Sequence, residues 1–158
     1  MKKIVTYFSA SGTTKALAET MKEALGCDIY EIQPEKKYTQ ADLDWRDKNS
    51  RSSVEMNDKS FRPAIKDIDA GLGEYDVIYV GFPIWWYVAP TIVNTFLEKY
   101  DLGGKKIVVF ATSGGSKMGN TVKELEVSAK GAEFIDGGIL NGKKTAEEIA
   151  EWDKGLGL

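Results

Sequence analysis

A short run of hydroxyl-bearing residues and glycine, SASGTT at residues 9–14, has the composition of a phosphate-binding loop. It follows an apolar run and precedes a helical pattern, so it is expected to join a strand to a helix. Such a turn aims unpaired backbone N–H groups at one point, where the helix end adds a fractional positive charge. The alternative interpretation is that Thr13 or Ser11 only caps the helix. The candidate phosphate-binding residues are Ser9, Ala10, Ser11, Gly12, Thr13 and Thr14.

Two adjacent tryptophans, Trp85 and Trp86, stand directly after another apolar run, in the stretch GFPIWWYVAP at residues 81–90. Two consecutive side chains cannot both point into one core, so at least one ring is expected to face a crevice or solvent. An aromatic face offers an offset-stacking surface to a planar ring. The alternative is that one tryptophan packs beneath the loop and Tyr87 shields the following helix. The candidate ring-binding residues are Pro83, Ile84, Trp85 and Trp86.

A third loop, TSGGSKMGNT at residues 112–121, is again rich in small residues and follows a strand-like run. Its glycines would let the backbone approach a ligand closely. The glycine spacing does not match the dinucleotide-binding fingerprint, and an ordinary loop is the alternative when this stretch is considered alone. The candidate ligand-contacting residues are Ser113, Gly114 and Gly115.

Alternating strand and helix patterns position these three loops. The pattern implies right-handed βαβ crossovers, a parallel sheet and helices on both faces. We therefore predict one domain over residues 1–158, a three-layer α/β/α sandwich with a five-stranded parallel sheet in the order 2-1-3-4-5. The expected strands are residues 2–8, 27–33, 75–82, 105–113 and 132–140, and the expected helices are residues 14–25, 91–100, 119–130 and 145–156, the last with a capping box from Thr145 to Glu148.

That strand order also predicts where a ligand binds. In a doubly wound sheet the crevice lies at the carboxyl ends of strands 1 and 3, where the winding reverses. A ligand should therefore touch residues 9–14, 83–90 and 112–120. A molecule with a phosphate at one end and a flat ring system at the other fits all three loops.

The composition excludes several kinds of chemistry. The 158 residues contain no histidine, which removes the commonest general base and the usual transition-metal ligand. The single cysteine, Cys27, allows no zinc or iron–sulfur cluster and is expected to be buried packing. We predict no catalytic side chain and no metal site, and expect a borrowed cofactor to carry any redox chemistry. A net charge of −3 argues against nucleic-acid and membrane partners, and a cytoplasmic location is expected.

The segment 34–69 departs from the alternating pattern. It is polar and holds all three arginines of the chain, Arg46, Arg51 and Arg62. Its length predicts a short helix around residues 41–49 followed by an irregular excursion. The arginines could receive a dinucleotide phosphate, but the equal number of acids and bases favours salt bridges at the surface.

Nearly the whole chain resembles the flavodoxin-like FMN-binding family, closest to its short bacterial members with a Pro-Ile-Trp-Trp loop. The resemblance is carried by YFSASGTTKALAE, by the run from Tyr75 to Gly119, by DLDWRDKNSRSSVEMNDKSFRP and by the closing EEIAEWDKGL. It implies FMN as the cofactor, with the phosphate on residues 9–14, the isoalloxazine against residues 83–86, and residues 113–115 at its other edge. Unlike flavodoxins of very low potential, this chain has no acid over residues 83–97 and carries Lys117 in the third loop.

Two redox roles are compatible with this resemblance. The first is a flavodoxin-type electron carrier between redox protein partners, which we favour. The second is an FMN-dependent NAD(P)H:quinone oxidoreductase, acting on a quinone or similar acceptor. The chain could be a monomer or a dimer in either role. A non-redox receiver domain would need clustered aspartates after the first strand, where this chain has Phe8 and Ser9.

Overall fold

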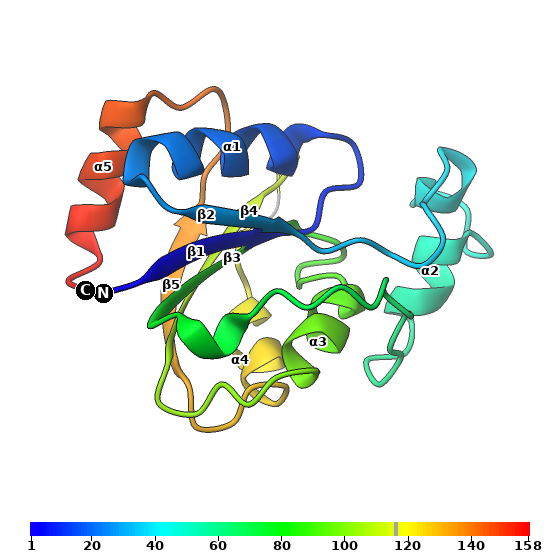
Figure 1. Ribbon diagram of the computed structural model, residues 1–158. Helices are drawn as coiled ribbons and strands as arrows, with labels where there is room; N and C mark the ends of the chain where they lie inside the picture. Colours follow the sequence, from blue (N-terminus) through cyan, green and yellow to red (C-terminus); the bar gives the residue numbers. More distant parts are fainter. Residues whose placement is uncertain (116) are drawn as a thin grey trace.

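A five-stranded parallel sheet forms the centre of the computed structural model, which describes residues 1–115 and 117–158 (Figure 1). The strand order β2-β1-β3-β4-β5 confirms the prediction. Each strand matches the run predicted for it to within two residues at either end. The strands are β1 (Lys3–Tyr7), β2 (Asp28–Glu31), β3 (Val77–Pro83), β4 (Lys106–Thr112) and β5 (Glu133–Ile139).

Helices cover both faces of the sheet and complete the predicted three layers. Helices α1 (Thr13–Leu25) and α5 (Ala146–Gly155) lie on one face, and α3 (Thr91–Glu98) and α4 (Thr121–Glu126) on the other (Figure 1). Helix α5 begins with the predicted capping box, in which the Thr145 hydroxyl and the Glu148 backbone N–H are 3.1 Å apart. Helix α4 ends sooner than expected, and just beyond its end Ser128 accepts a hydrogen bond from Asn94 of α3 at 2.8 Å.

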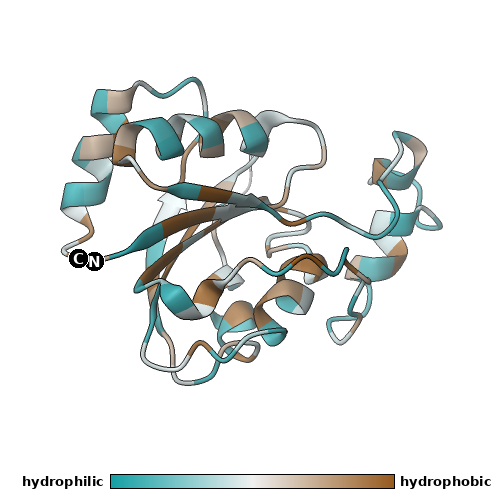
Figure 2. Ribbon diagram, viewed as in Figure 1, coloured by the Kyte–Doolittle hydropathy of each residue, from teal (hydrophilic) through white to brown (hydrophobic). Residues whose placement is uncertain are grey.

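The alternation of side chains along the central strands divides the core in two, and the apolar residues in Figure 2 concentrate on these strands. Val5, Tyr79 and Phe110 pack against α1 and α5. The next residue along a strand points to the other face of the sheet, as Val80 does toward α3 and α4. Burying such side chains contributes roughly 1.5–3 kcal/mol each. Gly81 in β3 is required by this packing, since a Cβ there would lie 2.1 Å from the Phe110 ring.

The segment between β2 and β3 corrects one prediction. Instead of a helix over residues 41–49, it forms a short 3₁₀ helix (Ala41–Leu43) and then α2 (Arg51–Met56). The side chains of Asp44 and Asp47 accept hydrogen bonds from backbone N–H groups two residues later, which stabilises turns in place of a helix. A second 3₁₀ helix (Leu72–Glu74) leads into β3.

The two ends of the sheet differ in what they carry. The loops that follow β1 and β3, together with α2, lie beyond the carboxyl ends of the strands, whereas both chain termini lie near the opposite end (Figure 1). Any site built from these loops is therefore remote from the termini. Cys27, expected to be buried, is only half-buried at this opposite end, and partial burial raises the pKa of its thiol.

Candidate functional site

The three predicted loops meet at the carboxyl edge of the sheet. The Phe8 N–H donates to the Gly81 carbonyl at 2.9 Å, so the first loop leaves β1 beside β3. The Ile84 N–H donates to the Thr112 carbonyl at 2.9 Å, which ties the tryptophan loop to the end of β4. The hydroxyls of Thr14 and Thr112 are also 2.9 Å apart and buried. The strand order thus brings together residues that lie up to about a hundred positions apart.

The first loop leaves the N-terminus of α1 without a side-chain cap. The N-cap residue is Gly12, and no side-chain capping hydrogen bond forms there among the residues that the structure describes, so the interpretation that Thr13 or Ser11 only caps the helix is wrong. The Ser9 hydroxyl instead accepts from the Gly12 N–H at 3.1 Å, inside the turn. Ser11, Gly12 and Thr13 are exposed, whereas Thr14 is buried with its hydroxyl bonded to Thr112. The loop therefore presents free backbone donors and two exposed hydroxyls to an anion.

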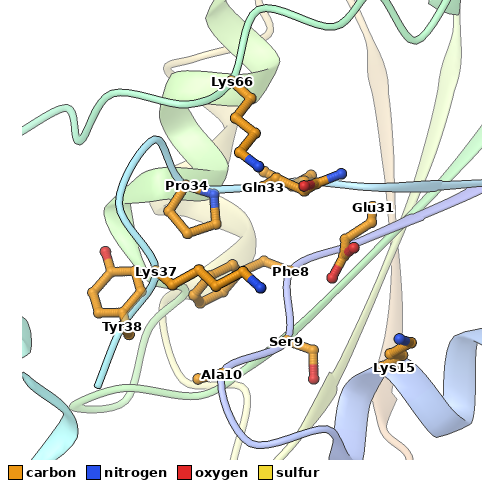
Figure 3. A pocket seen from close by; sticks show the side chains of 11 residues that line it. Phe8, Ser9, Ala10, Lys15, Glu31, Gln33, Pro34, Lys37, Tyr38 and Lys66 are labelled. Carbon is orange, nitrogen blue, oxygen red and sulfur yellow. The ribbon is translucent and has the colours of Figure 1, made fainter. Parts of the chain in front are cut away.

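A polar cavity of about 260 Å³ lies beside this loop (Figure 3). Lys15, Lys37 and Lys66 line it from three separate segments, with Phe8 and Glu31 also in its wall. Within the part of the chain that the structure describes, none of the three lysines forms an ion pair. Three cations against one carboxylate make this side of the first loop electropositive, which favours an anion such as a phosphate.

The tryptophan loop contains a tight turn with strained backbone. Trp85 and Val88 exchange two backbone hydrogen bonds, of 2.9 and 3.2 Å, around a two-residue turn. Both central residues, Trp86 (φ 48°) and Tyr87 (φ 69°), are in the left-handed region, as a type I′ turn requires. Asparagine and glycine are the usual residues there, because the left-handed conformation costs a bulky residue roughly 1–2 kcal/mol. The fold therefore holds the backbone of two large aromatic residues in an unfavourable conformation.

The two tryptophans have different environments. Trp85 is half-buried in an aromatic cluster, with its ring 5.7 Å from Phe8 and 5.5 Å from Tyr38, both edge-to-face. Trp86 is 42% exposed and Tyr87 is 68% exposed. Trp85 therefore braces the loop, whereas Trp86 and Tyr87 both keep an exposed face. The prediction that at least one tryptophan faces a crevice or solvent is confirmed.

A buried ionic group that the sequence did not reveal supports the aromatic cluster. Glu55 is only 5% exposed, accepts a hydrogen bond from the Tyr38 hydroxyl at 2.5 Å and pairs with Arg51 at 3.0 Å. The Arg51 guanidinium also lies 3.8 Å above the Tyr38 ring. Burial, and then the bond to Glu55, raise the pKa of Tyr38. Helix α2 is thereby fastened to the ring that braces Trp85.

All three arginines are paired with carboxylates. Arg46 pairs with Asp44 at 3.3 Å, and Arg51 pairs with Glu55 as described above. Arg62 makes two contacts with Glu98, at 3.0 and 3.1 Å. The interpretation of these residues as salt-bridged is confirmed.

The third loop is held in place by Asn141, another residue that sequence reasoning missed. The Ser113 N–H donates to the Asn141 side-chain oxygen at 2.8 Å, and the Asn141 amide donates back to the Ser113 carbonyl at 2.7 Å. Gly114 and Gly115 are exposed and have no left-handed φ, and a Cβ at either position would have no described atom within 4 Å beyond its chain neighbours. The described part of the fold therefore does not require glycine at either position. Ser116 lies outside the described residues.

Gly119 connects the third loop to the tryptophan loop. Its φ is +52°, and a Cβ at this position would lie 2.9 Å from the Tyr87 carbonyl oxygen. The end of the third loop therefore packs directly against the strained turn.

The described residues contain no cluster of three or more side chains suited to a metal ion. They also include no helix with the length and apolarity needed to cross a membrane.

The sheet order and the helices on both faces define a doubly wound α/β protein, a class in which ligands bind at the carboxyl edge of the sheet. The family model for flavodoxin matches residues 2–156. The chain belongs to the flavodoxin family.

Solved structures agree with this assignment. A protein from Bacteroides uniformis, provisionally assigned as a flavoprotein, is 52% identical with a TM-score of 0.90, and the match covers 97% of each chain. A similarly assigned protein from Bacteroides eggerthii is 47% identical with a TM-score of 0.93, covering 99% of this chain and 98% of that one. The flavoprotein of Lactobacillus acidophilus in complex with FMN shares the fold at 23% identity, with a TM-score of 0.69 and coverage of 96% and 98%. No curated protein matches the chain.

Proposed function

We propose that this protein binds FMN and carries electrons between redox protein partners, as a flavodoxin does. The observation that carries the proposal is the uncapped N-terminus of α1, which opens at the same edge of the sheet as the exposed face of Trp86. A phosphate needs the first feature and a flat ring the second. The neighbours assigned as flavoproteins, and the FMN complex of the more distant one, support FMN as the molecule that carries both.

The residues at the phosphate end fit the dianion of FMN. Backbone N–H groups in the first turn of α1 would donate to its oxygens, together with the exposed hydroxyls of Ser11 and Thr13. The three lysines beside the loop add long-range attraction without needing to touch the phosphate. The Thr14 hydroxyl is committed to Thr112, so this residue would contribute through its backbone.

The residues at the ring end fit an isoalloxazine. Trp86 would stack on the ring while Trp85, held by Phe8 and Tyr38, keeps the loop in position. Gly114 and Gly115 would allow the third loop to approach the opposite edge of the ring. Bound FMN supplies the redox chemistry, accepting and releasing electrons singly or in pairs. The chain needs only to bind and orient it, which agrees with the absence of histidine from the sequence.

The paired arginines favour the carrier over an NAD(P)H-dependent quinone reductase. A reductase of that kind would need cations to receive the dinucleotide phosphates. Arg46, Arg51 and Arg62 each have a carboxylate partner, and the three lysines described above, which form no ion pair in the described part of the chain, line the cavity beside the loop proposed for the FMN phosphate. An electron carrier needs no such site. We therefore place the protein among electron-transfer flavoproteins that a separate reductase reduces.

Titration of the purified, flavin-free protein with FMN tests the proposal, with flavin fluorescence as the readout. Trp86→Ala should raise the dissociation constant about tenfold through lost stacking and apolar contact. Trp45→Ala is the matched control, since Trp45 is another exposed tryptophan and lies outside the proposed FMN site. No binding of FMN to the wild type would refute the proposal. Rapid anaerobic bleaching of the FMN complex by NADPH alone would replace the carrier with the reductase.

A further inference from the structure

The loops at the carboxyl edge of the sheet are basic. Those that leave β1, β3, β4 and β5 contain no aspartate or glutamate, and they span residues 8–12, 84–90, 113–120 and 140–145. Lys117, Lys143 and Lys144 lie in these loops, and Lys15 lies in the first turn of α1. Lys143 and Lys144 line a cavity together with Thr13 of the first loop. None of the four lysines forms an ion pair with a residue that the structure describes.

Acidic residues concentrate at the opposite end of the sheet. Asp28 begins β2, Glu133 begins β5, and Glu74 and Asp76 lead into β3. Because the whole chain has a net charge of −3, the molecule outside the basic edge carries more negative than positive charge. A bound FMN phosphate would add about two negative charges to the edge and leave the four lysines in excess. The charge is therefore strongly asymmetric, which orients an approaching charged partner.

Two exposed aromatic residues lie at the centre of this basic edge. The strand order β2-β1-β3-β4-β5 sends the loop of Trp86 and Tyr87 out between the loops that lead to Lys15 and Lys117. Gly119 packs against the Tyr87 carbonyl, which holds the loop of Lys117 beside the aromatic turn. The edge therefore has an apolar centre and a charged rim, the arrangement typical of protein–protein interfaces.

Tyr87 has a conformation that its contacts within the chain do not explain. Its φ of 69° is unfavourable for a bulky residue, yet its ring is exposed and makes no aromatic contact within the described part of the molecule. Backbone strain at an exposed position points to a functional role. Tyr87 is not among the residues assigned to FMN. Tyrosine is one of the residues that dominate the binding energy at the centre of protein interfaces.

The charges select the kind of partner. A second copy that docked through the same face would bring the lysines of both copies together, and they would repel. Nucleic acids and anionic membranes extend past the basic edge and would meet the negative remainder of the molecule. A protein with a local acidic patch meets neither obstacle.

We propose that the carboxyl edge is a docking surface for a protein with an acidic surface patch. Tyr87 is its central apolar contact, and Lys15, Lys117, Lys143 and Lys144 form its rim. Only the role of that partner as a redox protein rests on the proposed function, because binding needs the charge and the aromatic centre but not the flavin. The asymmetry of charge steers the acidic patch toward the loops assigned to FMN.

NMR titration of the isotope-labelled protein with two small probe proteins tests the proposal. The probes are an acidic plastocyanin and a basic cytochrome c, both fully reduced, and each titration is run with and without FMN. We expect plastocyanin to shift the amide signals of the loops at the carboxyl edge. Its affinity should fall about tenfold when the salt concentration rises from about 20 to about 200 mM. Cytochrome c should not bind at this edge.

Matched double variants separate the charge of the edge from the net charge. Lys117→Gln combined with Lys143→Gln should weaken plastocyanin binding about fivefold. Lys130→Gln combined with Lys154→Gln removes the same charge from exposed lysines outside the edge, in the segment before β5 and in the last turn of α5, and should leave binding unchanged.

A single variant tests the aromatic centre. Tyr87→Asn removes the ring but introduces a residue that tolerates the left-handed conformation. It should weaken plastocyanin binding about tenfold without lowering the free energy of unfolding, so that lost binding does not reflect lost folding.

Several results would overturn the proposal. They are absence of plastocyanin binding, tighter binding of cytochrome c at this edge, and equal effects of the two double variants. Tighter binding of an oligothymidylate to the same loops would assign the surface to nucleic acid. Self-association of the wild type that Lys117→Gln with Lys143→Gln abolishes would assign it to a second copy. The two proposals fail separately: if FMN does not bind but plastocyanin binds with the expected sensitivity, the docking surface stands and the proposed function falls.

Discussion

The left-handed conformation of Tyr87 predicts an unusual order of stability between two variants. Tyr87→Gly should be more stable than Tyr87→Ala, although glycine is normally the more destabilising residue. Tyr87 is 68% exposed and has φ 69°, so both variants lose little burial and differ mainly in backbone energy. The comparison therefore isolates the strain in the turn from the contribution of the aromatic ring.

The expected difference follows from two opposing terms. Alanine in the left-handed region costs roughly 1–2 kcal/mol, which glycine avoids. Glycine in turn loses about 0.4–1 kcal/mol through the greater freedom of its unfolded chain. The net advantage of Tyr87→Gly is about 1 kcal/mol in the free energy of unfolding. With a urea m-value of about 2 kcal/mol per molar, the midpoints should differ by about 0.5 M.

Urea denaturation followed by circular dichroism measures this difference, and Val127 supplies the matched control. Val127 is similarly exposed, at 61%, but has φ −64°. Val127→Gly should therefore be less stable than Val127→Ala by about 0.5–1 kcal/mol, the reverse order. If the glycine variant is the less stable at both positions, the turn is not strained and the reasoning about the loop is wrong.

Three further predictions concern the surroundings of the site. Glu55→Gln should lower the free energy of unfolding by about 2 kcal/mol by leaving a partly buried guanidinium unpaired, whereas the exposed Glu126→Gln should not, in the same urea assay. The hydrogen bond to Asp28 raises the pKa of Tyr75 to about 12 from 10.0, so the free energy of unfolding falls as the pH rises between these two values. Tyr75→Phe should reduce this fall by about 2 kcal/mol, and a variant with the pH profile of the wild type would contradict the assignment. Asn141→Ala removes both hydrogen bonds to the third loop and should weaken FMN binding about tenfold, with unaltered binding counting against a role for that loop.

The sheet could be predicted from sequence because its signals are local and repeated. Unbroken apolar runs such as the one ending at Phe82 mark strands buried on both faces, and the alternation with helices then determines the order of the sheet. The positions of the three loops followed from that order alone. The prediction of a helix over residues 41–49 was wrong because aspartate side chains accept hydrogen bonds from nearby backbone N–H groups. The spacing of apolar residues in the sequence does not reveal this competition.

The supporting residues of the site could not be predicted in the same way. Tyr38 and Glu55 are 17 positions apart and Ser113 and Asn141 are 28 apart, with no shared motif. Their contacts exist only because the fold brings separate loops to one edge of the sheet. The burial of the Ser52 hydroxyl, which has no hydrogen-bond partner within the described part of the chain, is likewise invisible in sequence, since a serine among polar residues is indistinguishable from a surface residue until its burial is known.

The long connection between β2 and β3, over residues 32–76, adds little entropy to the cost of closing the fold. Loop-closure entropy grows only logarithmically with length, so a connection of this size costs about 1 kcal/mol more than one of about ten residues. Substitutions and insertions in it should therefore be tolerated well by the sheet. Because this connection also carries Tyr38 and Glu55, which support Trp85, we expect related chains to vary the surroundings of the tryptophan loop while keeping the same sheet.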